Sequence, residues 1–160
     1  RSSDLPRIGK DGRPFLIFKF RTMHKALTDP TAEKLTEKDD PRVTRVGAFL
    51  RRTSIDELPQ LFNVLKGDMS IVGPRPHAPA AKAAESLYWE VDERYWARHC
   101  IKPGMTGLAQ VRGHRGPTDR HEDLINRLQS DLEYVTNWSM WRDLRIIVAT
   151  LGVLAHDNAI

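Results

Sequence analysis

Two adjacent carboxylates, Asp56 and Glu57, closely follow a pair of arginines, Arg51 and Arg52. A carboxylate held beside phosphate-binding cations can attack phosphorus and form an acyl phosphate. It can also hold Mg²⁺, a hard cation that usually binds one or two carboxylates together with substrate phosphates. The spacing leaves both roles open, so Asp56 and Glu57 are candidates for nucleophile and for metal ligand. Arg52 is a candidate phosphate ligand, because a guanidinium pairs bidentately with phosphate.

The same segment also fits a purely structural pattern. Ser54 and Glu57 have the spacing of a capping box at a helix start. Pro59 argues against capping as the whole explanation, because a proline inside the first turns removes a backbone hydrogen bond and clashes with the preceding carbonyl. Capping and chemistry are compatible, since Asp56 stays free in a capping box. We therefore predict a helix that begins at Ser54 and presents Asp56.

Arg75 and the residues after Phe18 are further candidates for phosphate binding. Arg75 lies between Pro74 and Pro76, so its backbone loses little conformational entropy when a phosphate binds. Lys19, Arg21 and Thr22 follow a strand-like segment and are placed to reach the same site. The structural alternatives are an exposed turn for Arg75 and a basic strand edge for the other three.

A glycine-rich segment over residues 103–113 supplies a second group of candidates. Glycines allow the backbone to approach a ligand closely, and the donors in this segment are Thr106, Gln110 and Arg112. A structural loop is the alternative. The segment matches neither a Walker motif nor a dinucleotide fingerprint, and the histidines show no spacing typical of a metal site.

The composition suits a single soluble domain, and it fits phosphate-bearing partners and a merely soluble basic surface about equally. The chain has 160 residues, a formal net charge of +4 and 17 arginines among its 25 basic residues. Arginine-rich basic proteins often bind nucleotides, lipid headgroups or nucleic acid, although no nucleic-acid-binding motif is present. A lone cysteine, Cys100, excludes an internal disulfide framework, and we expect it to be a packed thiol. We expect no signal peptide and no ordinary transmembrane helix.

The elements that position these candidates are mostly helical. Lys10-Asp11-Gly12 predicts the turn of a β-hairpin over residues 7–20, and residues 24–41 read as a surface loop with a short helix. Gly67 is the expected end of the helix that begins at Ser54. Further helices are expected over 79–99, 119–136 and 139–155, with extended or looped segments over 71–76 and 102–117. The fold class is therefore α+β, mostly helical with a small N-terminal β-hairpin.

Several long blocks of the chain resemble one family. The run from Thr53 to Pro76, TSIDELPQLFNVLKGDMSIVGPRP, looks like the signature of bacterial sugar transferases. These are the monotopic-type polyprenyl-phosphate phosphoglycosyl transferases, which start exopolysaccharide, O-antigen or other glycan assembly. Three more blocks agree in order along the chain: KFRTM at 19–23, PGMTGL at 103–108 and DLEYVTNWS at 131–139.

The resemblance implies a two-step reaction. Asp56 would attack the β-phosphorus of a UDP-sugar, release UMP and carry a phosphosugar that polyprenyl (undecaprenyl) phosphate then accepts. Glu57 would assist by binding Mg²⁺ or managing protons, and Arg75 would bind phosphate. Mg²⁺ held by Asp56 and Glu57 would neutralise the diphosphate and favour departure of UMP. The alternative is a non-catalytic nucleotide- or phosphate-binding regulatory module.

The resemblance also carries expectations about the membrane. Family members have an apolar N-terminal membrane helix before the hairpin, so residues 1–160 are expected to be one catalytic domain from the C-terminal part of a longer membrane protein. The expected location is the cytoplasmic face of the bacterial inner membrane. The last helix carries Trp138, Trp141, Arg142 and Arg145. This set has two interpretations, a belt at the membrane interface or an ordinary core helix. Ala109 replaces an aromatic residue that many members carry.

Overall fold

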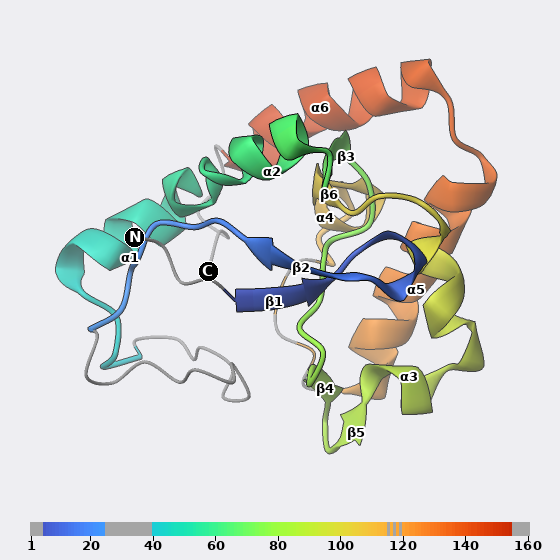
Figure 1. Ribbon diagram of the computed structural model, residues 1–160, viewed down its shortest axis with the longest axis horizontal. Coiled ribbons are helices and arrows are strands. Elements are labelled where there is room, and N and C mark those ends of the chain that lie inside the picture. The colour runs from blue at the N-terminus through green and yellow to red at the C-terminus, as the bar shows by residue number, and fades with distance from the viewer. Residues whose placement is uncertain (1–4, 25–39, 115, 117, 119, 155–160) are drawn as a thin grey trace.

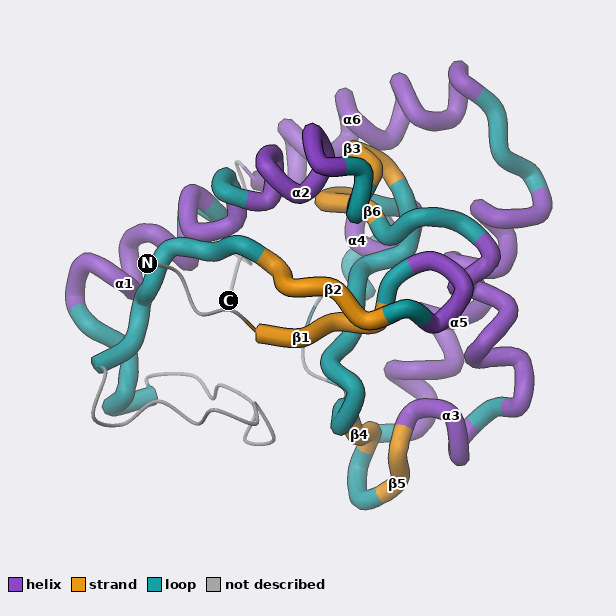
Figure 2. The backbone as a smooth tube through the Cα atoms, viewed as in Figure 1, coloured by secondary structure: helices purple, strands orange, loops and turns teal. Residues whose placement is uncertain are grey.

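The structure is a computed structural model that describes residues 5–24, 40–114, 116, 118 and 120–154. Its order of elements is mixed, with short strands between helices (Figures 1 and 2). This confirms the predicted α+β class and its helical majority. Most of the predicted loop at 24–41 lies outside the described residues.

The N-terminal hairpin is confirmed. Strands β1 (Leu5–Ile8) and β2 (Pro14–Ile17) pair antiparallel. The connecting turn contains Asp11 and Gly12 with φ of 55° and 73°, a left-handed conformation that suits these two residue types. The strand ends at Ile17, earlier than expected. After Ile17 the pairing with β1 stops, and Phe18 N donates instead to the Asn63 side chain at 2.9 Å.

The predicted helix at Ser54 is divided into two short elements. Helix α1 (Arg45–Arg52) is followed by a 3-10 turn, η3 (Ile55–Glu57), and then by α2 (Gln60–Lys66). Ser54 has a φ of 55° and its side chain makes no capping hydrogen bond to the turn, so the capping-box alternative does not hold. Pro59 begins α2 as its N-cap, which confirms the expected break. Gly67 ends α2 with a φ of 85°, as predicted.

Helix α2 buries its polar side chains and exposes its apolar ones, the reverse of an ordinary surface helix. Asn63 and Gln60 are 0% and 1% exposed, whereas Phe62 and Leu65 are 65% and 84% exposed. A surface helix normally turns its apolar stripe toward the core. Here the polar face is held inward because Asn63 also donates to Leu16 O at 2.7 Å, so α2 presents its apolar face outward.

The segments expected to be extended or looped contain a small parallel sheet. Strand β3 (Ser70–Val72) pairs with β6 (Gly104–Thr106), and helix α4 (Leu108–Val111) follows. The two backbones approach closely at Gly104, where a Cβ would lie 2.1 Å from Gly73 N. The glycine-rich segment therefore serves the packing of two backbones, which was the structural alternative for it.

The single helix expected over 79–99 is wrong. The segment forms β4 (Lys82–Ala83), β5 (Ser86–Leu87), α3 (Tyr88–Val91) and a 3-10 helix, η4 (Glu93–Cys100). Ala84, with a φ of 52°, makes the tight turn between β4 and β5. Tertiary packing overrides the helical propensity of the alanines. Cys100 is exposed, so the expectation of a packed thiol is also wrong.

The two C-terminal helices are confirmed as α5 (His121–Thr136) and α6 (Met140–Leu154). Their buried residues belong to two apolar clusters. One contains Leu124 and Leu128 of α5 against Tyr88 and Tyr95. The other joins Tyr134 and Ile146 to Val72 and Leu108. Helices α1, α2 and α6 run along the upper side of the view in Figure 1. No helix within the described ranges is long and apolar enough to cross a membrane.

Candidate active site

The carboxylate pair lies on the 3-10 turn between α1 and α2. The turn is held by i to i+3 backbone bonds, from Glu57 N to Ser54 O and from Leu58 N to Ile55 O, both 3.1 Å. Phe20 N donates to Asp56 O at 2.9 Å. This bond joins the chain after the hairpin to the turn, and it brings Lys19 to the carboxylates.

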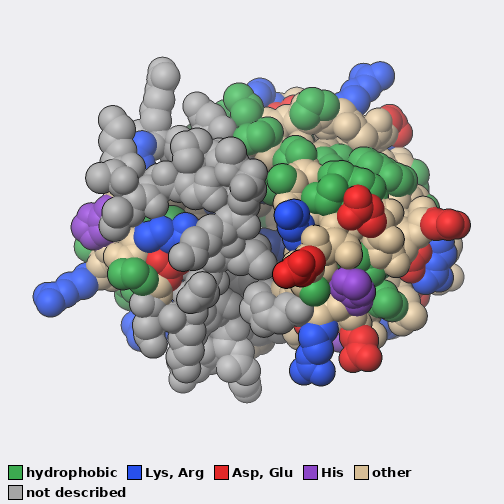
Figure 3. Space-filling model, turned by 90° about the horizontal axis from the view of Figure 1, so that it is seen from below, with side chains coloured by type: hydrophobic (Ala, Val, Ile, Leu, Met, Phe, Trp, Pro, Cys, Tyr) green, Lys and Arg blue, Asp and Glu red, His purple; other side chains and the backbone are tan. Residues whose placement is uncertain are grey.

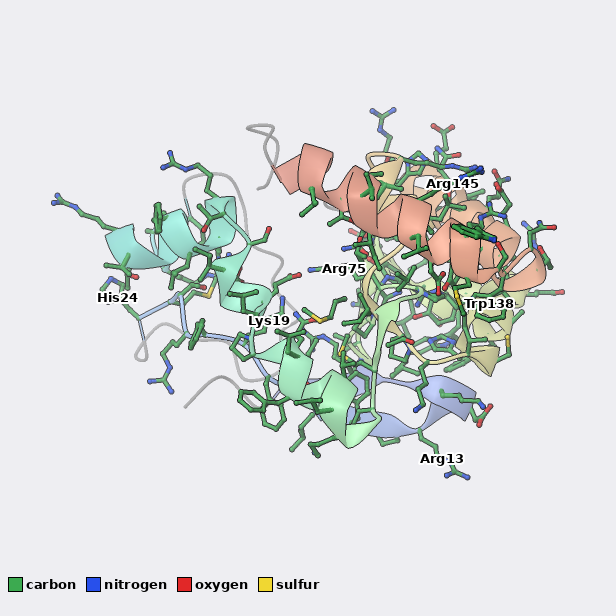
Figure 4. All side chains as sticks on the ribbon, turned by 90° about the horizontal axis from the view of Figure 1, so that it is seen from above. Arg13, Lys19, His24, Arg75, Trp138 and Arg145 are labelled. Carbon is green, nitrogen blue, oxygen red and sulfur yellow. The ribbon has the colours of Figure 1, made fainter. Side chains whose placement is uncertain are left out.

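Glu57 is surrounded by cations. Its Oε1 accepts from Lys19 Nζ at 2.8 Å and from Arg75 Nη2 at 2.5 Å, and its Oε2 accepts from Arg75 Nη1 at 3.1 Å. Lys19 and Arg75 converge in the space between α6 on one side and α1 and α2 on the other (Figure 4). Glu57 raises the pKa of Arg75, whereas burial lowers the pKa of Lys19 against the opposing effect of Glu57.

Asp56 is buried, yet its carboxylate receives no hydrogen bond within the described part of the chain. Burial raises its pKa above the usual 3.8, while Lys19 and Arg51 oppose that rise. A carboxylate that is desolvated and unpaired, but close to cations, keeps its lone pairs available for an electrophile or a metal. The two neighbouring acids therefore differ sharply in their surroundings.

The arginine next to Asp56 is Arg51. Its Nε donates to Thr22 Oγ1 at 2.8 Å, and it lowers the pKa of Asp56, whereas the predicted Arg52 is exposed at the end of α1. Gly47 permits this placement, because a Cβ there would lie 2.0 Å from Thr22 O. Helical spacing alone did not distinguish the two arginines, since the face of α1 that turns inward depends on this contact.

A buried hydrogen-bond network holds the backbone of Arg75 in place. Arg98 is 2% exposed and donates through Nη2 to Arg75 O at 2.6 Å and through Nε to Asp131 Oδ2 at 2.9 Å. Its Nη1 lies 3.1 Å from His77 Nδ1, which also lies 3.2 Å from Tyr95 Oη. Burial and the neighbouring Arg98 hold the pKa of His77 well below its usual value. No motif in the sequence singled out His77, Tyr95 or Arg98, and Asp131 stood there only as the first residue of the block at 131–139.

The other predicted phosphate ligands do not meet the carboxylates. Thr106 Oγ1 pairs with Thr150 Oγ1 at 2.6 Å, Gln110 Nε2 donates to Met105 O at 3.3 Å, and Arg112 forms a surface ion pair with Glu133 at 2.6 Å. Arg21 is exposed beside Thr22. Of the predicted site residues, the structure therefore brings Asp56, Glu57, Lys19 and Arg75 together.

The fit to Mg²⁺ rests on one free carboxylate. No cluster of three or more His, Cys, Asp or Glu side chains in the described ranges is arranged to hold a metal ion. Both oxygens of Glu57 are engaged by Lys19 and Arg75, so Asp56 is the carboxylate with open lone pairs. Such a site suits Mg²⁺, which keeps several waters and takes further ligands from substrate phosphates.

Asp56, whose carboxylate is paired with no group in the described ranges, thus lies next to a second carboxylate and several cations, a combination suited to an anionic ligand. The bacterial sugar transferase family matches residues 4–157, so the chain belongs to that family, as the resemblance predicted.

Similar proteins carry related names. An undecaprenyl-phosphate glucose phosphotransferase of Komagataeibacter xylinus is 52% identical over 91% of this chain and 27% of its own length. The exopolysaccharide production protein PSS of Rhizobium leguminosarum bv. phaseoli is 52% identical over 91% of this chain and 72% of its own length. A UDP-glucose:undecaprenyl-phosphate glucose-1-phosphate transferase of Escherichia coli (strain K12) is 50% identical over 91% and 30%. The chain thus spans less than a third of the first and third of these relatives.

Proposed function

We propose that this chain transfers a sugar-1-phosphate from a UDP-sugar to polyprenyl (undecaprenyl) phosphate. The observation that carries the proposal is the contrast between the two carboxylates: Glu57 is bound by Lys19 and Arg75, while Asp56 beside it is buried and paired with no group in the part of the chain that the structure describes. One similar protein is named as a UDP-glucose:undecaprenyl-phosphate glucose-1-phosphate transferase, a second as an undecaprenyl-phosphate glucose phosphotransferase and a third for exopolysaccharide production. These names support a glycan-initiating role with UDP-glucose as donor.

The reaction proceeds in two displacements. In the first, an Asp56 oxygen attacks the β-phosphorus, an acyl phosphate bond forms, and the bond to the bridging oxygen breaks with its electron pair leaving on UMP. In the second, an oxygen of the lipid phosphate attacks the same phosphorus and Asp56 leaves as a carboxylate. Both nucleophiles are anions, so neither step requires a proton to be removed. Lys19 and Arg75 stabilise charge on the transferred phosphate.

Mg²⁺ is the proposed cofactor. Asp56 is the protein ligand with free lone pairs, and the donor diphosphate supplies the remaining charge that a divalent cation requires. When bound, Mg²⁺ neutralises negative charge on the diphosphate. Glu57 acts in this proposal mainly as the counter-ion that orients Lys19 and Arg75, and it approaches the metal only if those cations move to the substrate.

A membrane surface is the proposed partner, at the cytoplasmic face of the bacterial inner membrane. Large apolar side chains are exposed on the three helices of one side, and we define the apolar helix face as Val46, Phe49, Phe62, Leu65, Trp141, Leu144, Val148 and Leu151. Trp138 and Trp141 are 60% and 76% exposed, which favours the interfacial belt over a core helix. On the opposite side, acidic and basic side chains are interspersed with hydrophobic ones (Figure 3).

The first displacement provides the test. The chain is incubated with UDP-glucose and Mg²⁺ without lipid, and UMP release and the mass of the peptide containing Asp56 are measured. We expect one UMP per chain and a hexose-phosphate increment on that peptide. Asp56→Asn should abolish both, whereas Asp11→Asn, on the exposed hairpin turn, should not.

The second displacement is tested by adding undecaprenyl phosphate to the labelled chain, which should remove the label and yield the diphosphate-linked lipid. Full UMP release by Asp56→Asn would contradict the nucleophile assignment. Binding of UDP-glucose with neither UMP release nor labelling would favour the alternative, a non-catalytic nucleotide- or phosphate-binding regulatory module.

A further inference from the structure

Arg7 on strand β1 lies beside the segment that carries Arg75. Ile8 N donates to His77 O at 3.0 Å, which joins β1 to the chain just after Arg75. Arg7 stands opposite Phe15 in the hairpin register, on the same face as the Leu5–Ile17 pair, because alternate residues of a strand share a face. Ile17 leads directly to Lys19. One hairpin therefore delivers two cations, Arg7 and Lys19, to the site.

The guanidinium of Arg7 has unused donors. Its one hydrogen bond in the described part of the chain runs from Nη1 to Pro6 O at 2.8 Å, and no acidic side chain there pairs with it. Burial and the neighbouring Arg75 lower its pKa to about 10, against the effect of Glu57. A partly buried cation held beside another cation is stabilised when an anion binds between them.

The charges around Glu57 are unbalanced. Lys19 and Arg75 pair with this one carboxylate, and Arg7 lies within its electrostatic reach, so three cations against Glu57 leave two positive charges in excess when Asp56 is not counted. Arg51, which donates to Thr22, interacts electrostatically with Asp56 and Asp40 and not with Glu57. The excess matches the charge of a phosphate monoester dianion.

In-line displacement determines which phosphate belongs there. The group that leaves phosphorus departs opposite the attacking Asp56 oxygen, and the group that later expels Asp56 must attack from that same direction. Both groups are phosphate monoesters in the proposed function: the nucleotide that leaves and the lipid phosphate that enters. One cationic subsite, opposite the Asp56 oxygen, can therefore bind both the leaving nucleotide and the entering lipid phosphate.

We propose that Arg7, together with Arg75, forms this exchange subsite and binds the phosphate monoester that leaves or enters opposite Asp56. Arg7 is then a substrate-binding residue for both half-reactions. This inference rests on the proposed function, because it takes the two monoesters from it.

Binding of UMP to the chain, measured by calorimetry at fixed salt, tests the subsite without turnover. Arg7→Gln should weaken UMP binding about tenfold or more, because it removes a charge-assisted hydrogen-bond donor. Arg13→Gln is the matched control, since Arg13 lies on the same hairpin and points away from Lys19 and Arg75 (Figure 4). A short-chain polyprenyl phosphate should compete with UMP on the wild-type chain, and uridine should not.

The outcomes separate the two proposals. Unchanged UMP affinity in Arg7→Gln, with labelling of Asp56 intact in the wild type, would overturn the role of Arg7 alone. Simultaneous binding of UMP and polyprenyl phosphate would overturn the shared subsite. A wild-type chain that binds neither UMP nor UDP-glucose would overturn both the subsite and the proposed function. If Arg7→Gln does not fold, Arg7→Lys should still weaken UMP binding severalfold, since it loses the planar fork, and unchanged affinity would refute the proposal.

Discussion

Arg75 and Glu57 lie 18 residues apart in the chain and form a bidentate ion pair, with Nη1–Oε2 and Nη2–Oε1 distances of 3.1 and 2.5 Å. Because of this ion pair, the adjacent acids Asp56 and Glu57 have different surroundings. Glu57 is neutralised and orients Arg75, while the Asp56 carboxylate is paired with nothing among the described residues. The division follows from geometry, because the 3-10 turn directs the two side chains to different neighbours.

Glu57→Gln should lower kcat/KM for UDP-glucose about 10- to 100-fold, because a charge-assisted hydrogen bond contributes about 1.5–3 kcal/mol. The amide cannot hold both Lys19 and Arg75, so neither cation stays oriented. Labelling of Asp56 should persist at the slower rate. Glu93→Gln, on η4, serves as the control. A large rise in the Mg²⁺ concentration needed for half-maximal activity would instead assign Glu57 to the metal.

Arg98 and Asp131 should be strongly coupled in stability. Removing one partner, as in Arg98→Met or Asp131→Leu, leaves a buried charge and should cost about 3–5 kcal/mol of unfolding free energy. The double variant should cost less than either single variant, since no buried charge remains. Urea denaturation of the four proteins measures this, and additive costs would contradict the coupling. Arg98→Lys should also reduce donor kcat/KM, because the Arg75 carbonyl loses its donor.

The free energy of unfolding should decrease below pH 6.5 partly through His99. Burial lowers the pKa of His99 from 6.5 to about 4 in the folded state. Below pH 6.5 the unfolded chain therefore binds a proton that the folded chain does not, and stability is lost as the pH falls toward 4. The loss is about 1.4 kcal/mol per pH unit for one such group.

His99→Phe should reduce the slope of the unfolding free energy against pH in that range, because one proton fewer is taken up on unfolding. Urea denaturation between pH 7.5 and 4.5 measures the slope, and the comparison at pH 7.5 isolates the change in packing against Tyr95 and Trp96. Equal slopes for the wild type and His99→Phe would show that His99 is protonated alike in the folded and unfolded states.

The apolar helix face should matter for membrane binding and little for folding. Replacing Phe62 and Leu65 by Gln should change the unfolding free energy by only about 0.5 kcal/mol per site, because both side chains are exposed. Binding to phosphatidylglycerol-containing vesicles at low salt should fall about tenfold or more, since each apolar side chain contributes about 1.5–3 kcal/mol when buried. Co-sedimentation measures it. Leu16→Gln, outside the three helices, is the control, and undiminished binding by the double variant would exclude this face.

Local sequence determined the parts of the fold that depend on neighbouring residues. Asp11-Gly12 specified the hairpin turn because both residues tolerate a left-handed backbone. Gly67 specified the end of α2 for the same reason, and Pro59 specified the break before it. The long periodic pattern specified α5. The blocks shared with the family identified Asp56 and Glu57 before any geometry was known.

Tertiary structure decided what depends on contacts between distant residues. Periodicity showed a polar and an apolar face on α2, but only the bonds from Asn63 to the hairpin turned the polar face inward. Likewise, the contact of Gly47 with Thr22 placed Arg51 at Asp56, and the β1 contact with His77 brought Arg7 to Arg75. The sequence by itself named the two candidate carboxylates. Which cations surround them was decided by packing across tens of residues, because side-chain spacing along one element says nothing about the element it meets.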